Sequence, residues 1–221
     1  MCEITNTIMA YFNNDGNNQH PRSKSWENCY IHFQTKHLNN EVEIRQLDSL
    51  QLGFYLASWG MYCRSSFLLQ NSYEIHTPVL QLIMEPRFEQ LWGHDFVFHP
   101  DEGWLNCLFS LKEEIVNKYR AEIIPNLEVS DTLVTKIILG VLGITPGYDS
   151  LFKYGCQIKD IRPYTNFSLG SFKRLLEFYL DNIESFNRAR NQIMELYDTE
   201  YPAMKLIDMY FWTIGYNNNH T

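Results

Sequence analysis

The stretch SDTLVTKIILGVLGITPGYDSLFKYGC, residues 130–156, contains the strongest structural signals in the chain. Ser130 or Asp131 can cap an apolar helix, because a side-chain oxygen there can accept the first free backbone N–H groups. The turn LGITPG follows, with Pro146 between two glycines, and a second short helix begins after Asp149. The stretch therefore predicts two helices joined by a tight turn.

The remainder of the chain also has helical periodicity, with apolar residues recurring every three or four positions. The longest such stretch is 41–70, which predicts a helix to about Met61 from the apolar residues Val42, Ile44, Leu47, Leu50, Phe54, Leu56 and Trp59. A long helix is expected from Ser168 or Ser171 to Leu196, and the segment AMKLIDMYFWTIG, 203–215, is apolar nearly all round and predicts a buried helix.

No segment alternates strongly enough for a sheet. We therefore expect a mainly α fold, a single compact domain of about eight to ten helices over residues 1–221 with little or no sheet. A division into lobes 1–125 and 126–216 is an alternative, and the tail 217–221 is expected to fray.

Composition excludes several classes of protein. The net charge is -8, so the basic footprint typical of proteins that coat DNA is missing, although a local cationic groove or an acidic surface for a partner remains open. The five cysteines have no zinc-type spacing and are expected to be reduced. The chain shows neither a secretory signal at its start nor an apolar run of about 18 residues, so we expect a soluble, cytoplasmic protein with no membrane partner.

The central turn is also a candidate site. Gly143 and Gly147 can expose backbone N–H groups that converge on an anion. Lys136 lies on the helix before the turn, and the turn delivers Tyr148 and Asp149 to the helix after it. We consider Lys136 and Asp149 candidate catalytic residues and Tyr148 a candidate ligand-stacking residue; the alternative is that Asp149 is only a helix cap.

The same region resembles the helical core of helix-hairpin-helix DNA glycosylase-like proteins over about the last 90 residues. The resemblance rests on Thr135, Lys136, Pro146, Asp149, Leu206, Asp208 and Trp212. It implies an all-helical fold whose hairpin amides hold a DNA phosphate, and an aspartate beside the pocket for a flipped base.

A second candidate site is SWGMYCRSSFLLQ, residues 58–70, which places polar groups within an apolar run. Trp59 can stack on a base, while Arg64, Ser65 and Ser66 can bind a phosphate or carboxylate. Alternatively, Arg64 pairs with a carboxylate of the chain itself, such as Asp149 or Asp208.

The histidines do not cluster at metal spacings. His94 and His99 share a loop with two aspartates, but the pattern HDFVFHPD is no established ligand motif, so we predict no metal and no cofactor.

These features favour a nucleic-acid- or nucleotide-directed protein on a glycosylase-like helical scaffold. A non-catalytic acidic module that binds or inhibits a protein partner is the alternative, and whether the chain is an enzyme stays open. A metal-dependent enzyme using His94 and His99 is a third hypothesis.

Overall fold

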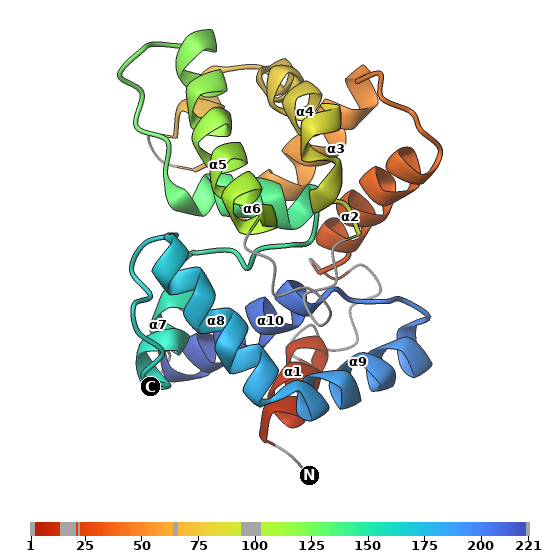
Figure 1. Ribbon diagram of the computed structural model, residues 1–221, viewed down its shortest axis with the longest axis vertical. Coiled ribbons are helices and arrows are strands. Elements are labelled where there is room, and N and C mark those ends of the chain that lie inside the picture. Colours follow the sequence, from red (N-terminus) through yellow and green to blue (C-terminus); the bar gives the residue numbers. More distant parts are fainter. Residues whose placement is uncertain (1–2, 14–20, 22, 64–65, 94–102, 220–221) are drawn as a thin grey trace. The chain divides into compact units, whose positions relative to one another are not determined.

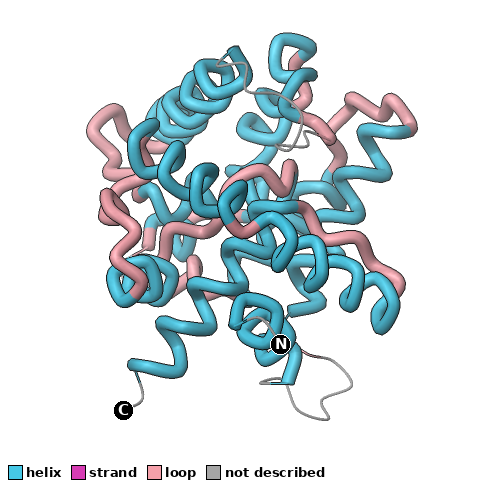
Figure 2. Tube along the Cα trace, turned by 60° about the horizontal axis from the view of Figure 1, so that its bottom comes forward, coloured by secondary structure: helices cyan, strands magenta, loops and turns pink. Residues whose placement is uncertain are grey.

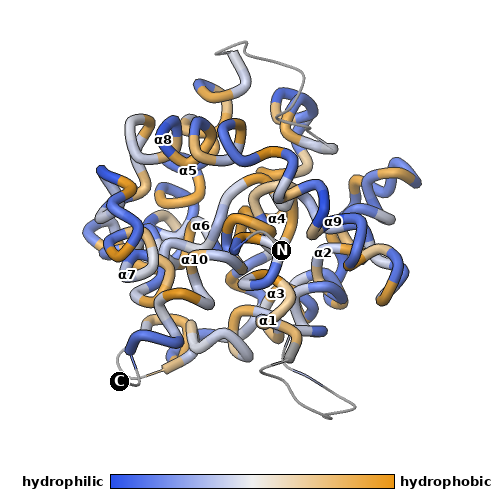
Figure 3. The backbone as a smooth tube through the Cα atoms, turned by 90° about the horizontal axis from the view of Figure 1, so that it is seen from below, coloured by the Kyte–Doolittle hydropathy of each residue, from blue (hydrophilic) through white to orange (hydrophobic). Residues whose placement is uncertain are grey.

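The computed structural model describes residues 3–13, 21, 23–63, 66–93 and 103–219. Within these ranges every regular element is a helix and none is a strand, which confirms the prediction of a mainly α fold (Figures 1 and 2). Hydrophobic and hydrophilic residues alternate along the helices (Figure 3), as expected where one side of each helix packs inward.

The backbone contacts divide the chain into two units. Unit 1 comprises Met1–Gln19, Asp95–Pro100 and Gly143–Thr221, and unit 2 comprises His20–His94 and Asp101–Leu142. The division between Leu142 and Gly143 falls inside the turn that follows the first helix of the central stretch.

Unit 1 is built around the C-terminal helix α10 (Ala203–Asn219), which packs against α1 (Glu3–Asn13), α7 (Ser150–Ile158), α8 (Leu169–Asp181) and α9 (Ile183–Tyr197). Every residue of α10 from 203 to 215 is buried, which confirms the prediction of a buried helix. A helix that is apolar all round can be accommodated only where other elements surround it.

Helices α7 and α10 approach so closely that their backbones touch at two glycines. A Cβ atom added to Gly155 would lie 1.9 Å from the carbonyl oxygen of Phe211, and one added to Gly215 would lie 2.0 Å from that of Leu151. No side chain fits at these distances. The two glycines therefore set the separation of the two helices.

The long helix expected from Ser168 to Leu196 is in fact two helices. Ser168 caps α8 as predicted, but the backbone leaves helical geometry at Asn182, where α8 ends and α9 begins. The side-chain amide of Asn182 donates to the carbonyl of Phe178, four residues earlier, at 2.9 Å. Asparagine competes with helix propagation in this way, and the apolar periodicity on both sides of the break concealed it.

Unit 2 contains five α-helices and three short 3₁₀ helices in its described residues. They are α2 (Ser23–Leu38), α3 (Gln46–Ser58), η1 (Phe67–Gln70), η2 (Tyr73–His76), α4 (Thr77–Ile83), η3 (Pro86–Leu91), α5 (Gly103–Glu122) and α6 (Asp131–Val141). The predicted cap of α6 is confirmed, since the Ser130 hydroxyl accepts from the backbone N–H of Leu133 at 3.2 Å.

Helix α3 buries only some of the apolar residues that predicted it. It spans Gln46–Ser58 and buries Leu52, Tyr55 and Leu56, whereas Leu47, Leu50 and Phe54 are 62%, 41% and 64% exposed. Both sides of the helix carry apolar residues, so periodicity alone could not tell which side packs inward.

Candidate functional site

Two of the sequence candidates meet in unit 2. The Lys136 ammonium, on α6, lies 5.1 Å from the centre of the Trp59 ring at the end of α3, which is the geometry of a cation–π contact. The Trp59 indole N–H donates to the Ser25 hydroxyl at 3.2 Å, which fixes the direction of the ring. Lys136 is buried, whereas the ring is half-buried.

The central turn belongs to unit 1 from Gly143 onward. The backbone N–H of Gly147 donates to the Asp208 carboxylate at 2.9 Å, and that of Asp149 donates to the Gly147 carbonyl at 2.8 Å. The Gly147 amide, which the sequence offered for an anion, is therefore satisfied inside the unit. The turn is tied to α10 by a carboxylate instead.

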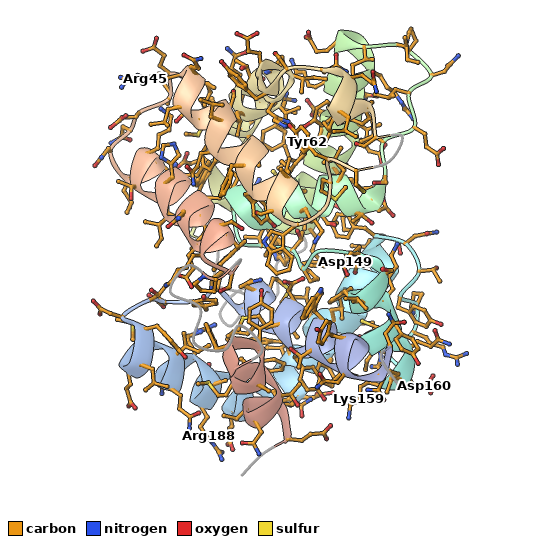
Figure 4. All side chains as sticks on the ribbon, turned by 180° about the vertical axis from the view of Figure 1, so that it is seen from behind. Arg45, Tyr62, Asp149, Lys159, Asp160 and Arg188 are labelled. Atoms are coloured by element: carbon orange, nitrogen blue, oxygen red, sulfur yellow. The ribbon has the colours of Figure 1, made fainter. Side chains whose placement is uncertain are left out.

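Asp149 and Tyr148 have structural contacts in unit 1. The Asp149 carboxylate accepts from the Phe152 N–H at 3.0 Å and so caps α7, at the position that Figure 4 labels. Tyr148 is fully buried, its hydroxyl lies 3.2 Å from that of Ser171, and its ring contacts Phe152 and Phe167. The helix-cap reading of Asp149 thus has a geometric basis.

The remaining sequence candidates are only partly described. Ser66 caps η1, with its hydroxyl accepting from the Leu68 N–H at 3.3 Å. Arg64 and Ser65 lie outside the described residues, as does the loop with His94 and His99. Trp59, Lys136 and Ser66 belong to unit 2, whereas Tyr148 and Asp149 belong to unit 1.

Lys205 and Asp208 form a buried ion pair that contacts the turn and that was not predicted from the sequence. The Lys205 ammonium donates to Asp208 at 2.9 Å and lies 5.2 Å from the centre of the Tyr11 ring. Gly147 and Lys205 both donate to the Asp208 carboxylate, so this buried group has two hydrogen-bond partners in the core. The signal was present in the sequence, because two opposite charges three residues apart interrupt an otherwise apolar helix.

A second cluster, also missed, lines a pocket of about 350 Å³ in unit 2. The walls are formed by His32, Thr35, Lys36, Glu41, Arg45, Leu47 and Asp48. His32 and Lys36 are one turn apart on α2, and Asp48 lies in the first turn of α3. Sequence reasoning assigned this region to helix periodicity and gave no weight to its charged residues.

Asp48 is the centre of this cluster, which we call the Asp48 pocket. One carboxylate oxygen lies 2.7 Å from His32 Nε2; the other accepts from the Arg45 N–H at 2.7 Å and lies 3.2 Å from Lys36 Nζ. Burial by itself would raise the pKa of the Asp48 carboxyl, but these three partners outweigh it and leave the pKa below its ordinary value. Asp48 is therefore ionised at neutral pH.

Three further observations bound the chemistry. In the described part of the chain no group of three or more His, Cys, Asp or Glu residues is arranged to hold a metal ion. The four cysteines it contains form no disulfide. Of the helices that the structure describes, none combines the length and apolar character needed to cross a membrane.

Comparison with protein-family models, with curated proteins and with solved structures found no match to this chain. Function is therefore inferred from the residues of the chain itself.

Proposed function

We propose that the protein binds nucleotides or short single-stranded nucleic acid, with Trp59 as the stacking ring and Lys136 as the cation beside it. The contact between these two side chains carries the proposal, because two residue types suited to a base and a phosphate share one place in unit 2. Base–aromatic stacking contributes about 1–3 kcal/mol per base and tolerates any sequence. The net charge of -8 favours a small local contact over extended coating of duplex DNA.

Fluorescence titration with nucleoside monophosphates and a short oligonucleotide, each at two salt concentrations, tests this proposal. Trp59→Ala is expected to weaken binding by about fivefold or more, since it removes the stacking ring. Trp59→Phe keeps a ring and should retain most of the affinity. Tyr154→Ala removes a partly exposed ring of unit 1 and is the matched control.

Salt gives the second readout. A phosphate contact releases counterions, so affinity must fall as the salt concentration rises, and the dependence should be smaller for Lys136→Met. Binding that is unchanged by Trp59→Ala and insensitive to salt would contradict the proposal.

The glycosylase-like resemblance adds a catalytic form of the proposal, in which Asp149 acts electrostatically or as a base on a flipped nucleotide. Asp149→Asn separates this role from the cap, because asparagine caps helices as well as aspartate does. If Asp149 is catalytic, release of a damaged base from an oligonucleotide is lost in Asp149→Asn while thermal stability is kept. If Asp149 serves only as the cap, the two proteins behave alike.

A non-catalytic interaction module is the second candidate, favoured by the apolar stripe Leu47, Leu50 and Phe54 on α3. The exposed acidic residues Glu41 and Glu43 precede this helix. An apolar stripe beside acidic residues matches a basic amphipathic helix of a partner protein.

Anisotropy with two labelled amphipathic peptides, one Leu/Lys and one Leu/Glu, tests this second candidate. The basic peptide is expected to bind more tightly, and Phe54→Ser to weaken it by about fivefold or more if the stripe is a central contact. Leu196→Ser changes a similarly exposed apolar residue in unit 1 and should have no effect. Equal binding of both peptides would count against this surface.

A further inference from the structure

We propose that the Asp48 pocket is a binding site for a small anionic group, a carboxylate or a phosphate monoester, and that the side chain of Glu41 competes with this ligand for Lys36. The site is separate from the Trp59–Lys136 contact and does not depend on the nucleotide proposal. Its volume of about 350 Å³ is at the lower end of the range for small-molecule sites.

Lys36 is a buried cation that lines the pocket. Its side chain is 5% exposed, and its ammonium has three N–H donors. Its ion-pair partners in the described residues are Asp48, at 3.2 Å, and Glu41, whose carboxylate oxygen is 3.9 Å away and thus beyond hydrogen-bonding distance. A buried ammonium gains from close hydrogen-bonded partners, and a single short carboxylate contact leaves donor capacity on Lys36, which lines the pocket.

Glu41 lines the pocket beside Lys36. Its side chain is 44% exposed, and its carboxylate is a charge-matched but loosely placed partner for a buried cation. A ligand carboxylate or phosphate that approached Lys36 to within 3 Å would make the short, charge-assisted contact that Glu41 does not make. Glu41 could then turn to water at little cost, because it is already largely solvated.

Arg45 and His32 also line the pocket. The Arg45 side chain projects from the chain just before α3 (Figure 4) and is mostly exposed, with Glu43 4.0 Å away. His32 is fixed by Asp48 at Nε2, so Nδ1 of the neutral ring can accept a hydrogen bond from water or from a hydroxyl of the ligand, while the anionic group is left to Lys36 and Arg45. Arginine is suited to planar, bidentate recognition of carboxylate and phosphate.

The charges that face the pocket give a defined specificity. Lys36 and Arg45 are cationic, and Asp48 and Glu41 are anionic, with Asp48 already bonded to three donors. Once Glu41 is displaced, the free surface of the pocket is cationic. Leu47 adds an apolar wall, which fits a ligand with a short carbon chain attached to its anionic group.

The test is an NMR titration of the full chain with inorganic phosphate, glycerol 3-phosphate and succinate at constant ionic strength. We expect changes in amide chemical shift that are confined to the C-terminal end of α2 and the N-terminal end of α3. Glu41→Gln is expected to tighten binding by about threefold or more, because it removes a competing charge, and Arg45→Gln to weaken it by about fivefold. Glu177→Gln and Arg174→Gln are the matched controls, since these residues form an exposed ion pair in unit 1.

The outcome also distinguishes the sources of the ligand. Preference for succinate assigns the pocket to carboxylates, and preference for glycerol 3-phosphate over inorganic phosphate assigns it to phosphate monoesters with a carbon chain. Shifts that are scattered over the surface, or affinities that are the same in Glu41→Gln, Arg45→Gln and the control variants, would overturn the proposal. Lys36→Met removes a partner of buried Asp48; if it fails to fold, the two exposed variants still decide.

Discussion

His76 lies in the core of unit 2 between two tyrosine hydroxyls. Its Nδ1 atom is 2.7 Å from the Tyr119 hydroxyl and its Nε2 atom is 2.7 Å from that of Tyr62. Burial lowers the pKa of His76 to about 4 and raises the pKa of both tyrosines. All three groups are therefore neutral at pH 7 and hold one another by hydrogen bonds; Figure 4 labels Tyr62.

This histidine should make the protein sensitive to mild acid. Its pKa is about 4 when folded and about 6.5 when unfolded, so the unfolded chain binds more protons between these values. Its effect is absent above pH 6.5 and grows as pH falls, to a loss of about 2–3 kcal/mol at pH 4.5 relative to pH 7. Urea unfolding at these two pH values measures the loss.

His76→Gln is the informative variant, because glutamine can still donate and accept hydrogen bonds but does not titrate. Whatever its stability at pH 7, it should lose less stability on acidification to pH 4.5 than the parent protein. Asp48 does not obscure the result, since its pKa is lowered and its contribution is lost only at more acidic pH. An unchanged pH dependence would contradict this account.

Asp149 gives a second prediction at this scale. Its carboxylate caps α7, so Asp149→Ala is expected to cost about 1 kcal/mol in the free energy of unfolding, and Asp149→Asn much less. Thermal denaturation of the two variants measures the difference. Equal losses in both would show that the capping bond contributes little.

In unit 1, helices α7 and α10 meet backbone to backbone at Gly155 and Gly215. Gly155→Ala and Gly215→Ala are each expected to destabilise by about 2 kcal/mol or more, because the added methyl meets backbone atoms that cannot move independently. Chemical denaturation measures the effect.

Gly170→Ala is the control for these two variants. It lies in α8, and an added Cβ would have only the Pro163 ring at 3.9 Å. Alanine there should be neutral or stabilising by up to about 1 kcal/mol, since it favours the helix. Similar losses at all three glycines would mean that helix propensity, and not the close approach, dominates.

The helices themselves were largely predictable, and their packing sides were less so. The cap at Ser130, the cap at Ser168 and the buried helix 203–215 follow from local chemistry and apolar periodicity. Which side of α3 faces the core does not follow from them, because it depends on the neighbours that packing brings against this helix. The break at Asn182 could not be predicted from apolar periodicity, because the pattern continues on both sides of it.

At the scale of the whole molecule, the division into two units makes a direct prediction. Unit 2 has its own apolar core and the His76 network, so a fragment 20–142 is expected to fold alone, with helical circular dichroism and a cooperative thermal transition. Unit 1 is discontinuous, because it joins separate stretches of the chain: α1 packs on α9 and α10. A fragment 143–221 without α1 is therefore expected to be less stable than the same fragment with residues 1–19 supplied.

Local sequence pattern predicted the helical class, the caps at Ser130 and Ser168, and Trp59 and Lys136 as candidates, because helix caps and periodicity act over a few residues. The sequence offered lobes 1–125 and 126–216 only as an alternative to a single domain; the backbone contacts group residues 1–19, 95–100 and 143–221 in one unit and the rest in the other.

Packing between distant segments brings Trp59 to Lys136 and Asp208 to Gly147, and it places Asp48 of α3 against His32 and Lys36 of α2. Burial makes unpaired charge costly, so a buried charge acquires partners, but which partners are near is set by packing between distant segments and not by local pattern.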